Sequence, residues 1–215
     1  MRGRTSWTQA QGEPTVTLLL RHGQTPMSVQ KRYAGLSDVP LTEVGVQQAA
    51  AAGKRLASAG LTAIVTSPLA RTTRTAEEVA AATGAPVEAD EGFRETDFGA
   101  WDGLTFAEVR ERWPAELTAW LADPAVAPPG GESLTDVSSR VDSALRRVLA
   151  GYQGQTVLIV SHVTPIKTLV AAALLAPPPS LYRMHLDVAA LCQVDWYADG
   201  PAVLRSFNDT GHLSD

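Results

Sequence analysis

Cysteine and long apolar runs are both scarce in this chain of 215 residues. The single cysteine, Cys192, cannot form an internal disulfide, and no group of Cys and His has the spacing of a zinc site. No stretch approaches the roughly 18 apolar residues of a membrane span, and the first residues lack the apolar segment of a signal peptide. We therefore expect a cytoplasmic protein without a membrane partner, in which Cys192 is a small buried apolar residue.

Positive charge is also in short supply. The 18 Lys and Arg residues are outnumbered by 23 Asp and Glu residues, which gives a net charge of -5. A broad nucleic-acid surface needs clustered Lys and Arg to displace counterions from phosphates, so we expect this domain to bind no nucleic acid. A small anionic substrate stays compatible with this composition, because a local cationic pocket can lie within an acidic surface.

The chain carries three strand-to-helix units. Apolar runs predict strands at residues 15–20, 61–67 and 155–162, and helical patterns follow them at 41–60, 68–84 and 164–176. Thr42 and Thr164 are the expected N-caps of the first and third helices, and Pro68 is expected in the first turn of the second. This order predicts an α/β fold, a three-layer α/β/α sandwich around a mostly parallel central sheet.

One stretch breaks the alternation. Residues 97–129 form a short helical region that contains Pro114 and ends in a proline-rich loop, so we expect a small helical cap over a pocket. A helix at 133–152 and a terminal hairpin at 186–207 complete the predicted order. The expected domain limits are a tail or linker remnant at 1–14, one domain at 15–210 and a tail at 211–215.

Charged side chains gather where the predicted strands end. Arg21 and His22 follow the first strand, Arg71 lies in the first turn of the second helix, and His162 follows the third strand. Ligands of open α/β sheets bind beyond the carboxyl ends of the strands, so we expect these four side chains to converge. Two guanidiniums, with helix starts at residues 68 and 164, predict a site for a phosphate group.

Phosphoryl chemistry also needs a nucleophile. The candidates at this rim are the two imidazoles and the hydroxyls of Ser67, Ser161 and Thr25. A neutral imidazole is the best nucleophile near neutral pH without a dedicated base, and surrounding cations lower a histidine pKa and keep the ring unprotonated. Gly23, directly after His22, would let the backbone approach a ligand and permits a positive φ.

Five motifs in this order resemble those of the histidine phosphatase superfamily, also called phosphoglycerate mutase-like. They are Arg21-His22-Gly23, "TSPLARTTRTA" at 66–76, "RETDFGAWDG" at 94–103, "PGGES" at 129–133 and "VSH" at 160–162. The resemblance covers about residues 15–210 and implies the phosphoglycerate mutase-like version of the predicted fold.

The resemblance implies a role for each matching residue. His22 would take the phosphoryl group as a phosphohistidine, while Arg21, Arg71 and His162 hold the phosphoryl oxygens. Glu95 would protonate the leaving alcohol and then help to activate water, which predicts activity that falls as the pH rises. No metal or other cofactor is expected, because the cluster itself supplies the positive charge.

Further phosphate contacts are expected from Thr25, Ser28 and Val163, and two of these depart from the family pattern. Many members have Asn at the position of Ser28 and Gly at the position of Val163. Ser28 can still donate one hydrogen bond, whereas Val163 can contribute only its backbone N–H. Neither change removes a group that the chemistry requires.

Three functions compete for this site. A mutase needs extra cations around a bisphosphate, but residues 96–129 contain two Arg and no Lys against six acids, and Ala34 stands where mutases usually have Ser or Thr. A non-catalytic phosphate- or phosphoprotein-binding module would have lost the nucleophile or the acid, and both His22 and Glu95 are present. We therefore favour a phosphomonoester hydrolase that acts on a small phosphate ester.

The insertion is rich in aromatic residues. Phe106, Trp113 and Trp120 recur every seven residues, which suggests one helical face that packs onto the core, or rings that line an apolar leaving-group pocket. Overall likeness is nearest to α-ribazole phosphatase-like members, some of which follow a ribonuclease H-type domain in actinobacteria. That resemblance suggests α-ribazole phosphate as substrate, with a role in cobalamin biosynthesis, and a covalent fusion to a domain absent here. Pairing of the terminal hairpin with a second subunit, as a homodimer, stays open.

Overall fold

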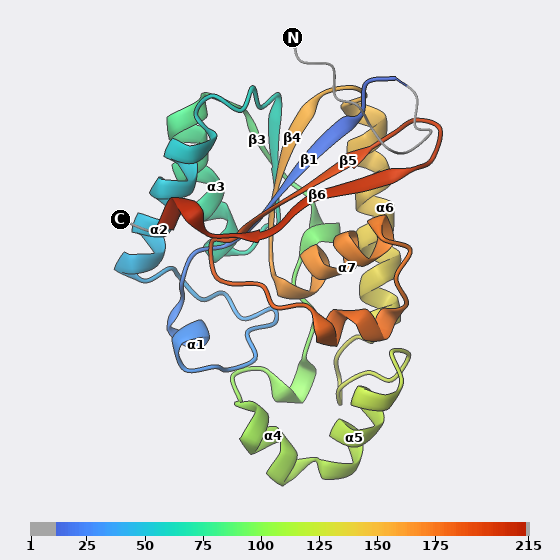
Figure 1. Ribbon diagram of the computed structural model, residues 1–215. Helices are drawn as coiled ribbons and strands as arrows, with labels where there is room; N and C mark the ends of the chain where they lie inside the picture. Colours follow the sequence, from blue (N-terminus) through green and yellow to red (C-terminus); the bar gives the residue numbers. More distant parts are fainter. Residues whose placement is uncertain (1–11, 214–215) are drawn as a thin grey trace.

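The computed structural model describes residues 12–213, which form a six-stranded sheet between helices (Figure 1). The strands are β1 (Thr15–Arg21), β2 (Ala63–Thr66), β3 (Val87–Ala89), β4 (Thr156–Ser161), β5 (Leu191–Trp196) and β6 (Ala202–Asp209). Their order in the sheet is β3-β2-β4-β1-β5-β6. The first four pair in parallel, and β5 and β6 add an antiparallel hairpin next to β1.

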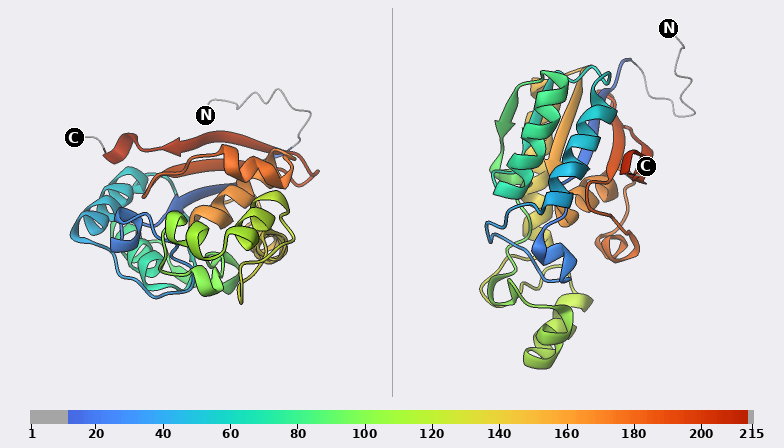
Figure 2. Two further views of the ribbon diagram at one scale, coloured as in Figure 1. Left: turned by 90° about the horizontal axis from the view of Figure 1, so that it is seen from below. Right: turned by 90° about the vertical axis from the view of Figure 1, so that its left-hand side faces the viewer.

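The two faces of the sheet carry different helices. Successive side chains of a strand point to opposite faces, and β1 shows this with two neighbouring leucines. Leu19 packs into an apolar cluster with α6 (Leu134–Gly151) and α7 (Val163–Ala173). Leu20 packs into a second cluster with α2 (Glu43–Leu56) and α3 (Ala70–Thr83), which lie in front of the sheet in the right-hand view of Figure 2. The predicted three-layer sandwich with a mostly parallel sheet is confirmed.

Two helix starts were predicted at the wrong residue. Thr42 does cap α2, since its side chain accepts a hydrogen bond from the N–H of Gly45. However, Leu69 precedes α3, so Pro68 lies outside that helix, and His162 rather than Thr164 is the N-cap of α7. The first four N–H groups of a helix lack intrahelical partners, so proline is tolerated at several first-turn positions and does not fix where the helix begins.

The predicted cap is a pair of short helices, α4 (Phe106–Arg112) and α5 (Pro114–Ala122), that form a separate lobe below the sheet in Figure 1. The prediction of one helical face for its three aromatic residues was wrong. The helix is interrupted at Trp113, because Pro114 lacks an N–H and begins a new helix. Phe106 is 45% exposed, whereas Trp120 packs into a buried cluster with Phe98 and Trp101.

Several short elements were not predicted. They are β3, the one-turn helix α1 (Pro26–Val29), and the 3-10 turns η1 (Glu91–Phe93), η2 (Gly99–Trp101), η3 (Pro178–Arg183) and η4 (Gly211–Leu213). The last of these contacts α2 and lies in the predicted C-terminal tail, while residues 1–11 of the predicted N-terminal tail fall outside the described residues. Within residues 12–213, no helix is long and apolar enough to span a membrane.

Candidate active site

The two histidines lie side by side because of the register between β1 and β4. Arg21 pairs with Ser161, and the N–H of His22 donates to the carbonyl of Ser161 at 3.1 Å. The next residue of each strand is a histidine, and their ring centroids are 5.2 Å apart in an edge-on arrangement. The chain after β1 leads to α2 on one face, while β4 leads to α7 on the other. The pair therefore occupies the point of the sheet where ligand crevices form.

The hydrogen bond of His22 determines which ring nitrogen is free. Nδ1 lies 2.8 Å from the carbonyl oxygen of Gly23, and a carbonyl can only accept, so Nδ1 carries the proton. Nε2 is then left with its lone pair. Burial, followed by the charges of Arg21 and Arg71, holds the pKa of His22 well below its usual 6.5. His22 is a neutral imidazole at physiological pH, as a nucleophile must be.

This lowered pKa is measurable. The Cε1 proton of His22 in an NMR titration is expected to show the neutral ring at every pH from 8 down to 6.5, and to move only at lower pH. Burial and the neighbouring charges disfavour the protonated ring, so His22 takes up its proton only at a pH below the usual pKa of a histidine. Arg21→Met removes one of the positive charges that lower this pKa and should shift the transition toward higher pH. A His22 midpoint at or above 6.5 in the parent protein contradicts the assignment.

Gly23 is required for a different reason from the one predicted. Its φ is not positive. Instead, a Cβ at Gly23 would lie 2.3 Å from the carbonyl oxygen of Gly45, and a Cβ at Gly45 would lie 2.1 Å from the carbonyl oxygen of Gln24. The two glycines thus allow the chain after His22 to lie directly against the first turn of α2, which fixes the backbone next to the nucleophile.

His162 packs against the ring of His22 and Arg71 donates to His162, and neither residue lines the cavity. Nε of Arg71 donates to Nδ1 of His162 at 3.2 Å, so Nε2 of His162 carries the proton and donates to Oγ of Ser67 at 2.8 Å. The Arg71 guanidinium also donates to the carbonyls of Ala34, Gly35 and Ser37. The structure therefore places both predicted residues close to the nucleophile. Most of their N–H groups already donate hydrogen bonds to other protein groups.

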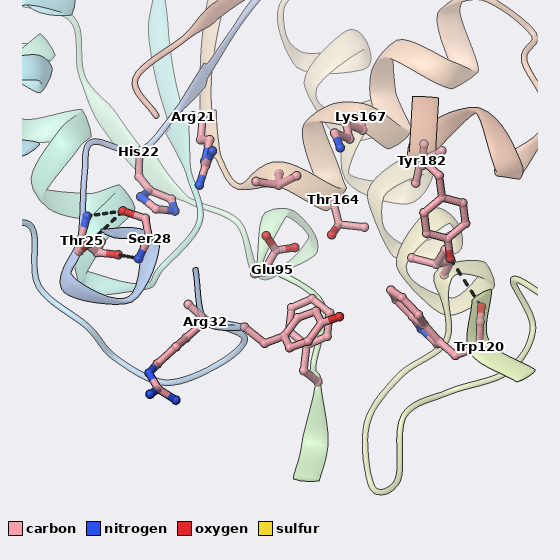
Figure 3. A pocket seen from close by; sticks show the side chains of 16 residues that line it. Arg21, His22, Thr25, Ser28, Arg32, Glu95, Trp120, Thr164, Lys167 and Tyr182 are labelled. Atoms are coloured by element: carbon pink, nitrogen blue, oxygen red, sulfur yellow. Dashed lines mark hydrogen bonds between the residues drawn. The ribbon is translucent and has the colours of Figure 1, made fainter. Parts of the chain in front are cut away.

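Arg21 has donors that face the cavity. One Nη donates to the carbonyl of Leu186 at 2.6 Å, while the buried Nε has no hydrogen-bond partner in the described part of the chain. Figure 3 shows its guanidinium beside His22. Burial is the main cause that lowers the pKa of Arg21 to about 10, so the group stays charged at neutral pH. A buried, charged N–H without a protein acceptor is poised for an anionic ligand.

The three predicted accessory contacts all line the cavity, with different donors available. The hydroxyl of Ser28 donates to the carbonyl of Thr25 at 2.8 Å and accepts from the Thr25 N–H, which uses its one proton. The Thr25 hydroxyl accepts from the N–H of Ser28, so its own proton is not used in that bond. Val163 is the first residue of α7, and its N–H belongs to the unpaired first turn of that helix.

The two helix starts differ in what they offer an anion. The first N–H of α3, at Ala70, donates to the carboxylate of Asp38 at 2.7 Å. The start of α7 instead borders the cavity through Val163 and Thr164. Of the two N-termini predicted to face a phosphate, the structure exposes that of α7 to the cavity and gives that of α3 a protein partner.

Glu95 reaches the cavity from the loop between η1 and η2. Its carboxylate is buried, and Oε1 accepts from the N–H of Thr96 at 2.8 Å. Figure 3 shows this carboxylate pointing into the space that His22 and Arg21 also face. Arg140 of α6 holds the loop, because it donates to the carbonyls of Arg94 and Glu95 and pairs with Glu132. The role of Arg140 was not predicted, since the carbonyl of Arg94 that it holds lies 46 residues away in sequence.

The "PGGES" motif supports this same loop. A Cβ at Gly131 would lie 2.3 Å from the carbonyl oxygen of Asp97, and a Cβ at Gly99 would lie 2.3 Å from that of Pro129. The two loops therefore cross at backbone contact distance. Glu132 stabilises this contact between the two loops, since it accepts a hydrogen bond from the N–H of Asp97 and pairs with Arg140. The motif places the Glu95 loop and does not itself line the cavity.

The cavity encloses about 290 Å³ and has two kinds of wall. Polar groups from the ends of β1 and α7 line one side. The other side is apolar and aromatic, and it includes Tyr33, Phe98, Trp120, Leu134, Leu181 and Tyr182. Two pairs of these rings are in contact, Tyr33 with Phe98 at 4.7 Å and Trp120 with Tyr182 at 5.9 Å between centroids. The buried ring of Trp101, which is not part of the cavity wall, connects the two pairs through contacts with Tyr33 and Trp120. Arg32 and Lys167, two cations of the wall, were not predicted as site residues.

This fold and this cluster of groups define a phosphoryl-transfer domain of the phosphatase or mutase type. Residues 17–210 match the family model of the histidine phosphatase superfamily, branch 1, and the chain belongs to that family. The resemblance inferred from the five motifs is thereby confirmed.

Three similar proteins show the range of this family. The "Bifunctional protein Rv2228c" of Mycobacterium tuberculosis is 51% identical over 96% of this chain, and the match spans 57% of that protein's length. The "Probable phosphoglycerate mutase GpmB" of Salmonella paratyphi B is 38% identical over 91% of this chain and 93% of its own. The solved structure of a putative α-ribazole-5'-P phosphatase from Escherichia coli has a TM-score of 0.83 at 26% identity, over 91% of this chain and 97% of the other.

Proposed function

We propose that this domain is a metal-independent phosphomonoester hydrolase that works through a phosphohistidine on His22. The observation that carries the proposal is the free Nε2 of a neutral His22, in one cavity with an unpaired N–H of Arg21 and the carboxyl group of Glu95. A nucleophile, a phosphoryl-binding cation and a proton donor are the minimum set for this reaction.

The proposed reaction has two steps. In the first, the Nε2 lone pair attacks phosphorus, the N–P bond forms, the P–O bond breaks, and the leaving oxygen takes the proton of Glu95. In the second, the Glu95 carboxylate takes a proton from water, the water oxygen attacks phosphorus, and the P–N electron pair returns to Nε2. Arg21, the Thr25 hydroxyl and the start of α7 would stabilise the phosphoryl oxygens throughout. Arg71 would act through its positive charge, and His162 would keep the ring of His22 in place by packing against it.

The aromatic wall supports a leaving group with a flat apolar face. Four rings of that wall border the cavity, from Phe98 and Tyr33 on one side to Trp120 and Tyr182 on the other. Aromatic side chains favour stacked or edge-on partners of their own kind. Nucleoside-like and aryl phosphate esters, α-ribazole phosphate among them, suit this wall better than a bare sugar phosphate does.

A mutase remains the second candidate, because one similar protein is named as a probable mutase. The cations of the outer cavity argue against it. Arg32 is paired with Glu108 at 2.9 Å, and Arg110 and Arg112 of the cap do not line the cavity. Two cap acids also have structural roles, since Asp102 accepts from the N–H of Gly35 and Glu108 caps α4. A bisphosphate would find few free cations here.

A substrate panel tests the proposal. In the presence of EDTA, phosphate release is expected from p-nitrophenyl phosphate, α-ribazole phosphate and nucleoside monophosphates, with little conversion of 3-phosphoglycerate to its isomer. The same panel with added Mg²⁺ is the control and should give equal rates, since protein cations supply the positive charge. Loss of activity in EDTA contradicts the metal-independent mechanism. Isomerisation faster than release identifies a mutase, and no turnover of any ester favours a binding module.

A further inference from the structure

Thr75 of α3 is fully buried, and its hydroxyl makes two hydrogen bonds. It donates to the carbonyl of Arg71, one turn earlier in the helix, at 2.8 Å. It accepts from the N–H of Gly23, which lies 52 residues away in sequence, at 3.2 Å. The first bond uses the one proton of the hydroxyl, so its oxygen meets Gly23 as an acceptor. This side chain therefore connects α3 to the residue that follows the nucleophile.

Gly23 is the residue whose carbonyl sets the protonation of His22. That carbonyl accepts from Nδ1 of the ring at 2.8 Å, which leaves the lone pair on Nε2. A glycine backbone can adopt more conformations than that of any other residue, so Gly23 does not fix this carbonyl by itself. Besides the close contact with Gly45, the direction of the carbonyl depends on the hydrogen bonds of the peptide groups on either side of Gly23.

The bond to Thr75 is the buried anchor of these peptide groups. Gly23 is itself buried and does not line the cavity, so water in the cavity cannot take the place of the Thr75 hydroxyl. Without that acceptor, a buried N–H would be left unpaired, which favours rotation of the peptide toward another partner. The remaining anchors are the N–H of Ala189, which donates to the carbonyl of His22 at 3.1 Å, and the side chain of Gln48, which accepts from the N–H of Gln24 at 2.9 Å.

We propose that Thr75 is a positioning residue for the nucleophile: its hydroxyl holds the peptide of Gly23 so that the Gly23 carbonyl keeps the proton of His22 on Nδ1. The inference rests on the proposed phosphatase function and adds to it a residue that acts without touching the substrate. A neutral imidazole can carry its proton on Nδ1 or on Nε2, and only the first tautomer has the Nε2 lone pair that forms the N–P bond. Removing the hydroxyl should let the second tautomer compete with the first.

Thr75→Val tests the effect on the reaction, because valine has the shape of threonine and lacks the hydroxyl. It should lower kcat/KM for p-nitrophenyl phosphate by about 10- to 100-fold, the usual cost of losing a group that orients a reacting residue. The inhibition constant of inorganic phosphate should stay near the parent value, since Arg21 and the start of α7 are unchanged. Thr75→Ser keeps the hydroxyl and should retain most of the parent kcat/KM.

The tautomer of His22 gives a readout that a general loss of packing would not move. In ¹⁵N-labelled protein, a protonated ring nitrogen and one with a lone pair have well-separated ¹⁵N shifts. His22→Ala identifies the His22 signals among those of the four histidines. The parent protein and Thr75→Ser should show the proton on Nδ1, whereas Thr75→Val should show a mixture of both tautomers or the Nε2–H form.

Thr83→Val is the matched control on the same helix. The hydroxyl of Thr83 donates to the carbonyl of Val79, again one turn earlier, at 2.9 Å, and accepts from the N–H of Ala85 at 3.3 Å. Because Thr83 does not line the cavity, this variant should keep the kcat/KM and the His22 tautomer of the parent protein. An unchanged kcat/KM in Thr75→Val overturns the proposal. So does a lower kcat/KM with the proton of His22 still on Nδ1.

Two further results are distinguishable from these. If a thermal melt shows that Thr75→Val does not fold, Thr75→Ala and Thr75→Ser provide the same test, because alanine and serine differ by one hydroxyl. Equal kcat/KM values and equal tautomers in that pair overturn the proposal. If the parent protein hydrolyses no ester, the phosphatase proposal fails, and the tautomer alone then tests Thr75: a proton on Nδ1 of His22 in every variant refutes the positioning role.

Discussion

His22→Ala is expected to lower phosphate release by about 10³-fold or more while the protein stays folded. The substitution removes the lone pair that forms the N–P bond, and no other group of the cavity is placed to replace it. Arg21 and Glu95 would remain, so weak binding of phosphate should persist. The fold should tolerate the change, because the His22 side chain donates its one hydrogen bond to the adjacent carbonyl of Gly23 and borders an open cavity. Steady-state release of phosphate and a thermal melt measure the two effects.

His185→Ala provides the matched control, since this side chain is 81% exposed and does not line the cavity. It should retain the activity of the parent protein. Brief incubation with a ³²P-labelled ester should label the parent protein with a phosphoryl group that is labile in acid and stable in alkali, as a phosphoramidate is, and should not label His22→Ala. Activity of His22→Ala within tenfold of the parent would contradict the assignment of the nucleophile.

Much of the site could be predicted because its main residues follow strands. The end of an apolar strand can be recognised in the sequence. Parallel strands bring their carboxyl ends to one edge of the sheet, so Arg21, His22 and His162 could be predicted to lie together. The register between β1 and β4 then sets the contact of the two rings. The cap could also be predicted, since Pro114 and the proline-rich loop interrupt the alternation of strands and helices.

What could not be predicted depends on contacts between distant segments. Arg71 was expected to hold the phosphoryl group, yet its guanidinium donates to carbonyls 34 to 37 residues away in sequence, and nothing in the local pattern specifies those acceptors. Arg140 and Lys167 resemble ordinary helix-surface cations in sequence. Their roles depend on which loop or cavity the helix face meets, which is a property of tertiary packing.

The close backbone contacts of Gly23 and Gly45 were also not predicted. Gly23 was expected to let the backbone approach a ligand and to permit a positive φ, and Gly45 falls within the helix predicted at 41–60. The structure shows instead that each is too close to a neighbouring backbone carbonyl for a side chain. A motif glycine can thus mark a contact between two segments, and a single sequence does not distinguish this from a requirement for positive φ.

Glu95→Gln is expected to lower the hydrolysis of alkyl phosphates by about 10²- to 10⁴-fold, the usual contribution of a general acid. The amide keeps the shape of the carboxyl group, and its oxygen can still accept from the N–H of Thr96. It cannot donate a proton to the leaving alkoxide or take one from water.

The leaving group separates the two roles of Glu95. p-Nitrophenolate leaves without a proton, so Glu95→Gln should still transfer the phosphoryl group of p-nitrophenyl phosphate to His22. Water attack then lacks its base, and the phosphohistidine should accumulate. Rapid mixing is expected to show a burst of about one p-nitrophenol per active site, followed by slow turnover. Glu91→Gln is the matched control, since the Glu91 side chain is 73% exposed and lies outside the cavity, and it should show neither effect. A variant Glu95→Gln that hydrolyses alkyl esters within tenfold of the parent, without a burst, would place the proton donor elsewhere.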